Sequence, residues 1–200
     1  MMKELIEEIK EIEHGFKHIV KCGDIILADK EEKHFDLAIK FLSDESYQVR
    51  MLATYLLGKL STDNSQALAL LETKVADDKN WRVQEMLAKA FDYYCNSIGY
   101  EKCLATIKRW IADENPNVRR AVTEGLRIWT SRPYFKENPV AAIQLISKNK
   151  SDESEYLRKS VGNALRDIGK KHKDEVLDEI SRWDLADKKT AFTHKLAKGK

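Results

Sequence analysis

A short segment recurs four times along this chain, and it constrains the fold more than any other feature. Each copy consists of an acidic turn, a branched apolar anchor and then a polar or basic residue. The anchors follow one another after 34, 35 and 39 residues and are Val49, Val83, Val118 and Leu157. A period in this range, without glycine-rich or strand-like stretches between the copies, is typical of an α-solenoid built from helix pairs.

Composition supports the same fold class. The 200 residues include 42% hydrophobic side chains, which suffice for one core, and only 3 prolines and 8 glycines interrupt the chain. Runs of β-branched residues are absent, so the pattern favours an all-α fold over strands. We therefore predict a single HEAT-like repeat domain over residues 1–200, in the form of an α-solenoid with an N-terminal capping helix.

The apolar spacing places the helices. Leu5, Ile9, Ile12, Phe16 and Ile19 recur at steps of three or four, which predicts one capping helix from about residue 3 to 20. The acidic turns open at Asp44, Asp77, Asp113 and Asp152, where their side chains can cap the next helix. Five helix pairs are then predicted, over 34–42 with 46–60, 65–75 with 81–95, 99–111 with 117–130, 139–146 with 155–169, and 172–183 with 187–197.

The termini and the cysteines bear on the compartment. No apolar stretch approaches the roughly 18 residues that a membrane span needs, and the N-terminus is a charged amphipathic segment unlike a signal peptide. The three cysteines form no paired framework, as expected in a reducing compartment. We expect a cytoplasmic monomer with no membrane association.

Charge alone does not identify a partner. The net charge is +2, from 35 basic and 33 acidic residues that are interleaved along the helices. Basic residues crowd the second half, and either a polyanion partner or a solvated helical face would explain them. His14, His18 and Cys22 share a helical spacing that could ligate a metal, but the sequence offers no fourth ligand, and we predict no metal site.

A second stripe on the repeats carries the unusual residues. The anchor and the residues four and eight further on are expected to pack inward, whereas the residues two and six after each anchor are expected to line the concave surface. This stripe contains Met51, Tyr55, Glu85, Lys89, Arg120, Glu124, Lys159 and Asn163. Trp81 precedes Glu85 by one helical turn, so charged and aromatic groups gather in the middle repeats.

Each of these residues also has a structural interpretation. An aromatic residue at a helix start often packs between repeats, as Trp81 could, and Glu85 could pair with Lys89 at i+4. Glu124 could likewise pair with Arg120. Arginines recur at equivalent repeat positions, where they would form salt bridges from turn to turn; these are Arg50, Arg119 and Arg158.

Three segments, NWRVQE, NPNVRRAVTEGLR and YLRKSVGNALRDIGKKH, together resemble the HEAT-like-repeat alkylpurine DNA glycosylases, the AlkD and AlkC group of DNA alkylation repair proteins. The resemblance covers about residues 77–183. It implies that the family's acid, four residues after an aromatic, is Glu85 after Trp81, where Asp is the commoner residue. It also implies that Arg120 is the DNA-contacting arginine and that Asn163 replaces a second aromatic of AlkD-like members.

The resemblance implies a monofunctional glycosylase that releases cationic N3- or N7-alkylated purines from double-stranded DNA without any cofactor. Glu85 would stabilise the oxocarbenium-like sugar and position a water, with the Trp81 ring as a wall near the lesion. The expected DNA contacts are Arg120, Arg119, Arg127, Arg132, Lys159 and Asn163. The alternative is a non-catalytic helical-repeat module that binds DNA structure or a protein, which the departure at Asn163 favours.

Overall fold

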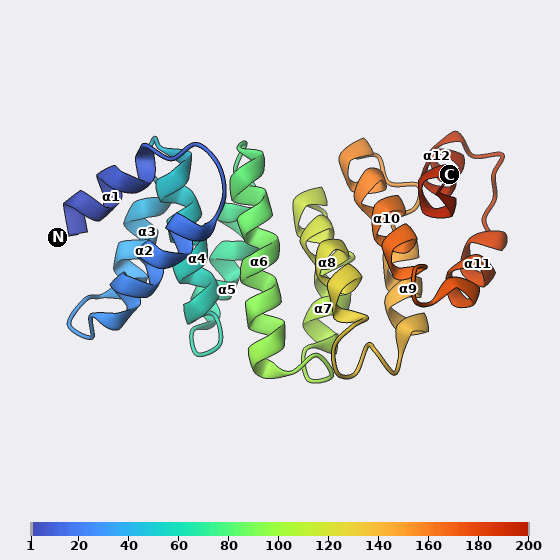
Figure 1. The fold of residues 1–200 in the computed structure, drawn as a ribbon, viewed down its shortest axis with the longest axis horizontal. Coiled ribbons are helices and arrows are strands. Elements are labelled where there is room, and N and C mark those ends of the chain that lie inside the picture. Colours follow the sequence, from blue (N-terminus) through green and yellow to red (C-terminus); the bar gives the residue numbers. More distant parts are fainter. Residues whose placement is uncertain (1, 200) are drawn as a thin grey trace. The chain divides into compact units, whose positions relative to one another are not determined.

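The computed structural model describes residues 2–199, and within them every regular element is a helix (Figure 1). Contacts between Cα atoms divide the chain into two compact units, residues 1–98 and 99–200. The all-α fold class is confirmed. The prediction of a single domain remains a prediction, and we describe each unit by itself. None of the described helices is long and apolar enough to cross a membrane.

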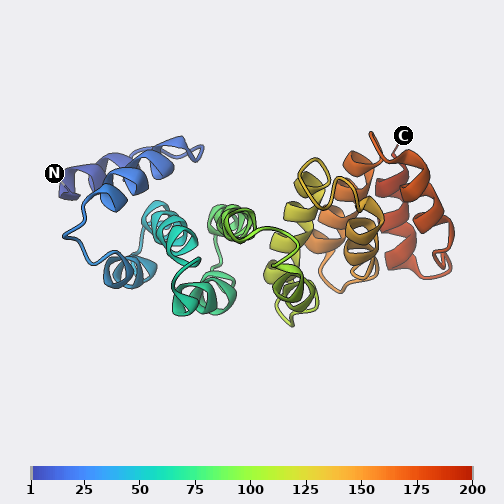
Figure 2. The ribbon, with the colours of Figure 1, turned by 90° about the horizontal axis from the view of Figure 1, so that it is seen from below.

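The first unit contains six α-helices and one π-helical segment. In chain order they are α1 (Met2–Lys10), α2 (Lys17–Ala28), α3 (His34–Leu42), α4 (Tyr47–Leu60), α5 (Ser65–Leu70), η1 (Leu71–Val75) and α6 (Trp81–Ile98). Helices α4 and α6 pack side by side in the middle of the unit. As Figure 2 shows, α2 lies on one side of this pair, while α3 and α5 lie on the other.

The second unit continues the helix pairs. Its elements are α7 (Leu104–Trp110), α8 (Pro116–Trp129), α9 (Pro139–Ser147), α10 (Glu155–Ile168), α11 (Lys173–Ser181) and α12 (Lys188–Lys198). Helices α8, α10 and α12 pack in succession, as do α9 and α11. The ten helices of the five predicted pairs are therefore present, and most of their ends lie within one or two residues of the expected positions.

The N-terminal prediction was wrong in one respect. The single helix expected from residue 3 to 20 is interrupted after Lys10, and a new helix begins at Lys17 and continues to Ala28. Gly15 lies in the connection with a φ of 91°, a conformation that glycine adopts without steric cost. The apolar spacing continues across this break, so periodicity alone could not reveal it.

The inward stripe of each repeat is confirmed by burial. The four anchors and the residues four and eight positions after them are completely buried, and they are Val49, Ala53, Leu57, Val83, Leu87, Phe91, Val118, Val122, Leu126, Leu157, Val161 and Leu165. Helices α4 and α6 approach closely beside this stripe. A Cβ added to Gly58 of α4 would lie only 2.7 Å from the Cβ of Ala90 on α6, so the contact requires glycine. The residues two positions after each anchor were expected to line an exposed surface, but two of them, Met51 and Arg120, are also buried.

Each acidic turn is built in the same way. One aspartate accepts a hydrogen bond of 2.8 Å from the backbone amide two residues further on; these aspartates are Asp44, Asp78, Asp113 and Asp152. The second copy therefore starts at Asp78, one residue after the position expected from sequence. Such local bonds fix the turn just before a helix starts.

The irregular connection between α8 and α9 is anchored by an aromatic cluster. Phe135 is completely buried, and its ring centroid lies 6.0 Å from that of Trp129 and 6.1 Å from that of Tyr100. Trp129 is also completely buried, so it packs in the core of the second unit. Tyr134 beside this cluster has a φ of 69°.

Candidate nucleic-acid interface

The first turn of α6 presents Trp81 to solvent. Trp81 is 52% exposed, in contrast to Trp110 and Trp129, which are completely buried. The side chain of Asn80 accepts a hydrogen bond of 2.9 Å from the Arg82 amide and so caps the helix start. Packing between repeats therefore does not explain Trp81, and its indole surface is available for contact with another molecule.

Glu85 follows Trp81 by one turn of α6, so the two side chains lie on the same face of this helix. Glu85 is partly buried, and Lys89 one turn further is exposed. The Lys89 ammonium lies 4.9 Å from the centroid of the Phe16 ring. This face of α6 therefore carries an aromatic ring, a carboxylate and an ammonium group in successive turns.

Arg82 occupies a position that sequence analysis did not single out. Its guanidinium carbon lies 4.5 Å from the Trp81 ring centroid and 5.0 Å from that of Tyr47. One of its terminal nitrogens lies 3.4 Å from Nδ1 of His14. The Tyr47 hydroxyl donates a 3.0 Å hydrogen bond to the Glu13 carbonyl, so the connection after α1 is held at this cluster.

The break before α2 also changes the interpretation of the N-terminal histidines. His14 lies in the connection, whereas His18 and Cys22 lie on α2. The three residues therefore do not lie on one helix, and the shared helical face that suggested a metal site is not formed. Burial raises the pKa of the Cys22 thiol to about 11, so this cysteine behaves as a buried apolar residue.

All six predicted DNA-binding residues lie in the second unit, whereas Trp81 and Glu85 lie in the first. Arg120 on α8 is only 5% exposed. Its Nε donates a 3.1 Å hydrogen bond to the Ser160 hydroxyl, and its guanidinium carbon lies 4.3 Å from the centroid of the Tyr156 ring. A 4.0 Å ion pair with Glu124 matches the i,i+4 pair that the sequence suggested.

The neighbouring arginines also contact acidic groups in their own unit. Arg119 forms a 2.6 Å ion pair with Asp152. Arg127 lies 3.0 Å from Glu124 and 3.0 Å from Asp167. These contacts neutralise much of the positive charge that was expected to face a polyanion, and the salt-bridge interpretation of Arg119 is confirmed.

The other predicted contacts have different surroundings. Arg132 donates a 2.5 Å hydrogen bond to the hydroxyl of Tyr100, and the exposed Lys159 pairs with Glu155 at 2.7 Å. Asn163 on α10 is partly buried. The roles of these residues in DNA binding remain predictions.

Tyr156 is a second residue that the sequence analysis missed. It is 42% exposed and lies against Arg120 in the first turn of α10. Tyr156 comes directly before the anchor Leu157, and Arg82 comes directly before the anchor Val83. The other two repeats hold Gln48 and Asn117 at this position, so its place in the repeat alone does not mark a residue as functional.

Comparison with known proteins identifies the family. Residues 21–194 match the family described as DNA alkylation repair enzyme. The crystal structure of AlkD2 from Streptococcus mutans is 47% identical, with a TM-score of 0.89, and the match covers 98% of this chain and 97% of that one. Bacillus subtilis YhaZ, an uncharacterised protein, is 37% identical over 87 residues, which span 42% of this chain and only 24% of YhaZ.

A more distant structure agrees in fold. The alkylpurine DNA glycosylase AlkC from Pseudomonas fluorescens, solved with DNA containing an abasic-site analogue, is 24% identical with a TM-score of 0.52. That match covers 98% of this chain and 62% of the AlkC chain, and it shows the fold alone. With the match over residues 21–194, the chain belongs to the DNA alkylation repair enzyme family.

Proposed function

We propose that this chain is a monofunctional DNA glycosylase that hydrolyses the N-glycosidic bond of cationic N3- or N7-alkylated purines in duplex DNA. The observation that carries the proposal is the half-exposed Trp81 on the same face of α6 as Glu85. Membership of the DNA alkylation repair enzyme family supports DNA as the substrate. AlkC from Pseudomonas fluorescens is itself an alkylpurine DNA glycosylase.

The chemistry suits the residue types on α6. An alkylated purine already carries a positive charge, so the bond electrons move onto the base and it leaves as a neutral molecule. Positive charge then develops on the sugar, where a carboxylate such as Glu85 would stabilise it and accept a proton from the attacking water. The Trp81 ring offers a π face to the cationic base before cleavage.

Release of free bases from methylated genomic DNA tests this proposal. We expect the wild-type protein to release 3-methyladenine and 7-methylguanine, and Glu85→Gln to slow the release about 100-fold, because the charged group is lost at nearly constant shape. The exposed Glu101 provides a matched control, and Glu101→Gln should retain the wild-type rate. Release at the wild-type rate by Glu85→Gln would exclude the carboxylate from the reaction.

A second candidate function is a non-catalytic module that binds DNA structure or a protein. The contacts of Arg119, Arg120 and Arg127 within the second unit favour it, because these groups already have acidic or polar partners. Folded protein that binds duplex DNA and releases no base would support this candidate. Contacts with DNA phosphates give a log–log salt slope of about −0.9 per phosphate, and an interaction insensitive to salt would indicate a protein partner instead.

A further inference from the structure

The first unit carries lysines that lie against aromatic rings. Besides the contact of Lys89 with Phe16, the Lys59 ammonium lies 4.1 Å from the Tyr93 ring centroid and 5.4 Å from that of Tyr55. Tyr93 follows Lys89 by one turn of α6. Basic and aromatic groups of α4 and α6 therefore lie beside one another, and Tyr55 among them reaches α2 through its hydrogen bond to Asp24.

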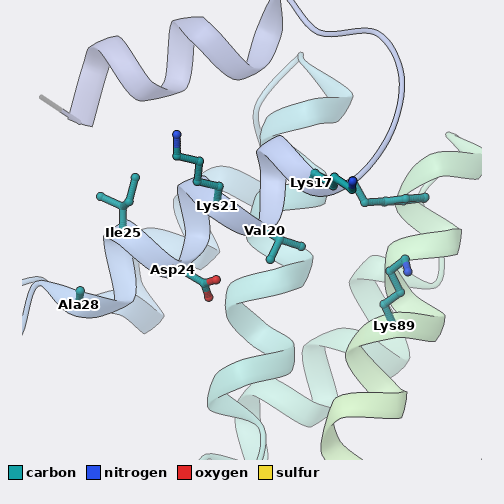
Figure 3. Close-up of a pocket in the computed structure, with 8 residues that line it drawn as sticks. Lys17, Val20, Lys21, Asp24, Ile25, Ala28 and Lys89 are labelled. Atoms are coloured by element: carbon teal, nitrogen blue, oxygen red, sulfur yellow. The ribbon is translucent and has the colours of Figure 1, made fainter.

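A hollow of about 640 Å³ lies at this surface, lined by α2, by Phe16 directly before it and by Lys89 of α6. Figure 3 shows Lys89 extending from α6 toward the end of α2 that carries Lys17, whereas Lys21 points away from α6 toward α1. Lys17 and Lys89 thus face the same end of the hollow. Val20 supplies part of its apolar wall.

The charge in this hollow is predominantly positive. Its one carboxylate, Asp24, accepts a 2.5 Å hydrogen bond from the Tyr55 hydroxyl. Within residues 2–199, Lys17 and Lys89 make no ion pair, and both side chains are exposed. They differ in this respect from Arg119 and Arg127, whose guanidinium groups contact carboxylates.

We propose that Lys17 and Lys89 bind phosphate groups of a DNA strand at this hollow. Lys89 lies four residues beyond Glu85 on α6, a rise of about 6 Å along the helix axis. A strand whose reactive nucleotide lies at Glu85 would therefore bring a flanking phosphate within reach of the Lys89 side chain. The ammonium groups act as point charges and release counterions when they meet phosphates.

The choice of DNA as the polyanion rests on the proposed function, but the site does not require catalysis. Binding to undamaged duplex measures the lysine contacts, and base release measures the reaction. If the wild-type protein binds duplex DNA but releases no base, the proposed glycosylase activity is contradicted and the phosphate site is not. If the salt dependence of binding is unchanged after the lysines are replaced, the phosphate site is contradicted and the glycosylase activity is not.

The test compares duplex DNA binding across a salt series for the wild-type protein and the double variant Lys17→Gln/Lys89→Gln. We expect the log–log slope to become less negative by about 1.8, the value for two lost phosphate contacts, and affinity at moderate salt to fall at least about tenfold. Lys17→Arg/Lys89→Arg should retain most of the slope, because the charge is kept.

Two exposed lysines on the other side of the first unit provide the control. Lys40 on α3 and Lys74 on η1 carry the same charge, and Lys40→Gln/Lys74→Gln should leave the slope unchanged. If the two glutamine double variants lose the same amount of salt slope and DNA affinity, the proposal is overturned, because net charge alone would then explain binding. Preferential loss of binding to anionic phosphatidylserine vesicles, with DNA binding unaffected, would also overturn it.

Discussion

The contacts of single residues decide what the candidate interface can bind. Trp81 has two ring faces, and the guanidinium of Arg82 lies over one of them. A cationic purine would be repelled by that charge, so it would stack on the opposite face. Arg82 thereby orients the ring and disfavours cations on one side, which makes it a positioning residue for the proposed reaction.

Quenching of tryptophan fluorescence tests this arrangement without any substrate. Of the 4 tryptophans, Trp81 is the exposed one, while Trp110 and Trp129 are completely buried and Trp183 is 7% exposed. We expect Arg82→Gln to lower quenching by iodide about twofold, because a positive charge near the ring attracts the anion. Arg82→Lys should restore it. Unchanged iodide quenching would show that Arg82 does not stay near the ring in solution.

Arg120 shows why residue roles are harder to predict than residue positions. The resemblance placed this arginine among the DNA contacts, but Ser160 and Tyr156 enclose its side chain. Both partners come from the next repeat, about 40 residues away in sequence. Local spacing predicted the pair with Glu124 on the same helix, whereas burial by another helix depends on packing that no local pattern encodes.

At the scale of elements, arginine clamps hold the acidic turns. The Nη1 of Arg50 donates to the carbonyl oxygens of Asp44 and Glu45 at 2.9 and 2.8 Å, and its Nε donates to the Asp78 carboxylate at 2.6 Å. Arg158 makes the same two carbonyl contacts with Asp152 and Glu153. Each clamp satisfies carbonyl groups at the turn that precedes a second helix.

The second repeat supplies a natural control, because Gln84 replaces the arginine and donates to the Asp78 carbonyl alone at 2.8 Å. Arg50→Gln should therefore keep part of the clamp and lose the ion pair, which lowers the free energy of unfolding by about 1 kcal/mol. Arg50→Ala should cost about 2–3 kcal/mol, because the turn carbonyls lose their donor. If urea unfolding shows the same loss of free energy for Arg50→Gln and Arg50→Ala, the glutamine side chain cannot reach the turn carbonyls.

On the scale of the whole molecule, periodic features were predictable and interruptions were not. The buried anchors and the five helix pairs follow from local apolar spacing, since each inward stripe must bury itself against a neighbouring helix. The break near Gly15 leaves that spacing intact and depends on one backbone conformation. The aromatic contacts of Lys59 and Lys89 join separate helices, so they also required the structure.

Two partly buried groups, His18 and Asp167, should each make the free energy of unfolding decrease in acid. Burial lowers the pKa of His18 below its ordinary value of 6.5, and its Nε2 is buried without a hydrogen-bond partner among the described residues. The Lys170 hydrogen bond, helped by the charge of Arg127, lowers the pKa of Asp167 below 3.8. In both cases the unfolded chain binds a proton more readily than the folded chain does.

The two groups therefore act in different pH windows. The His18 contribution is complete above pH 6.5 and is lost as the pH falls through its lower folded value, while the Asp167 contribution is complete above pH 3.8 and is lost below it. Urea unfolding between about pH 3 and pH 8 separates the two contributions. His18→Gln should reduce the pH dependence of the free energy of unfolding in the upper window, and Asp167→Asn should reduce it only in the lower window. If His18→Gln leaves the upper window unchanged, the ring must already be hydrated in the small hollow beside Cys22, and burial would no longer explain its preference for the neutral form.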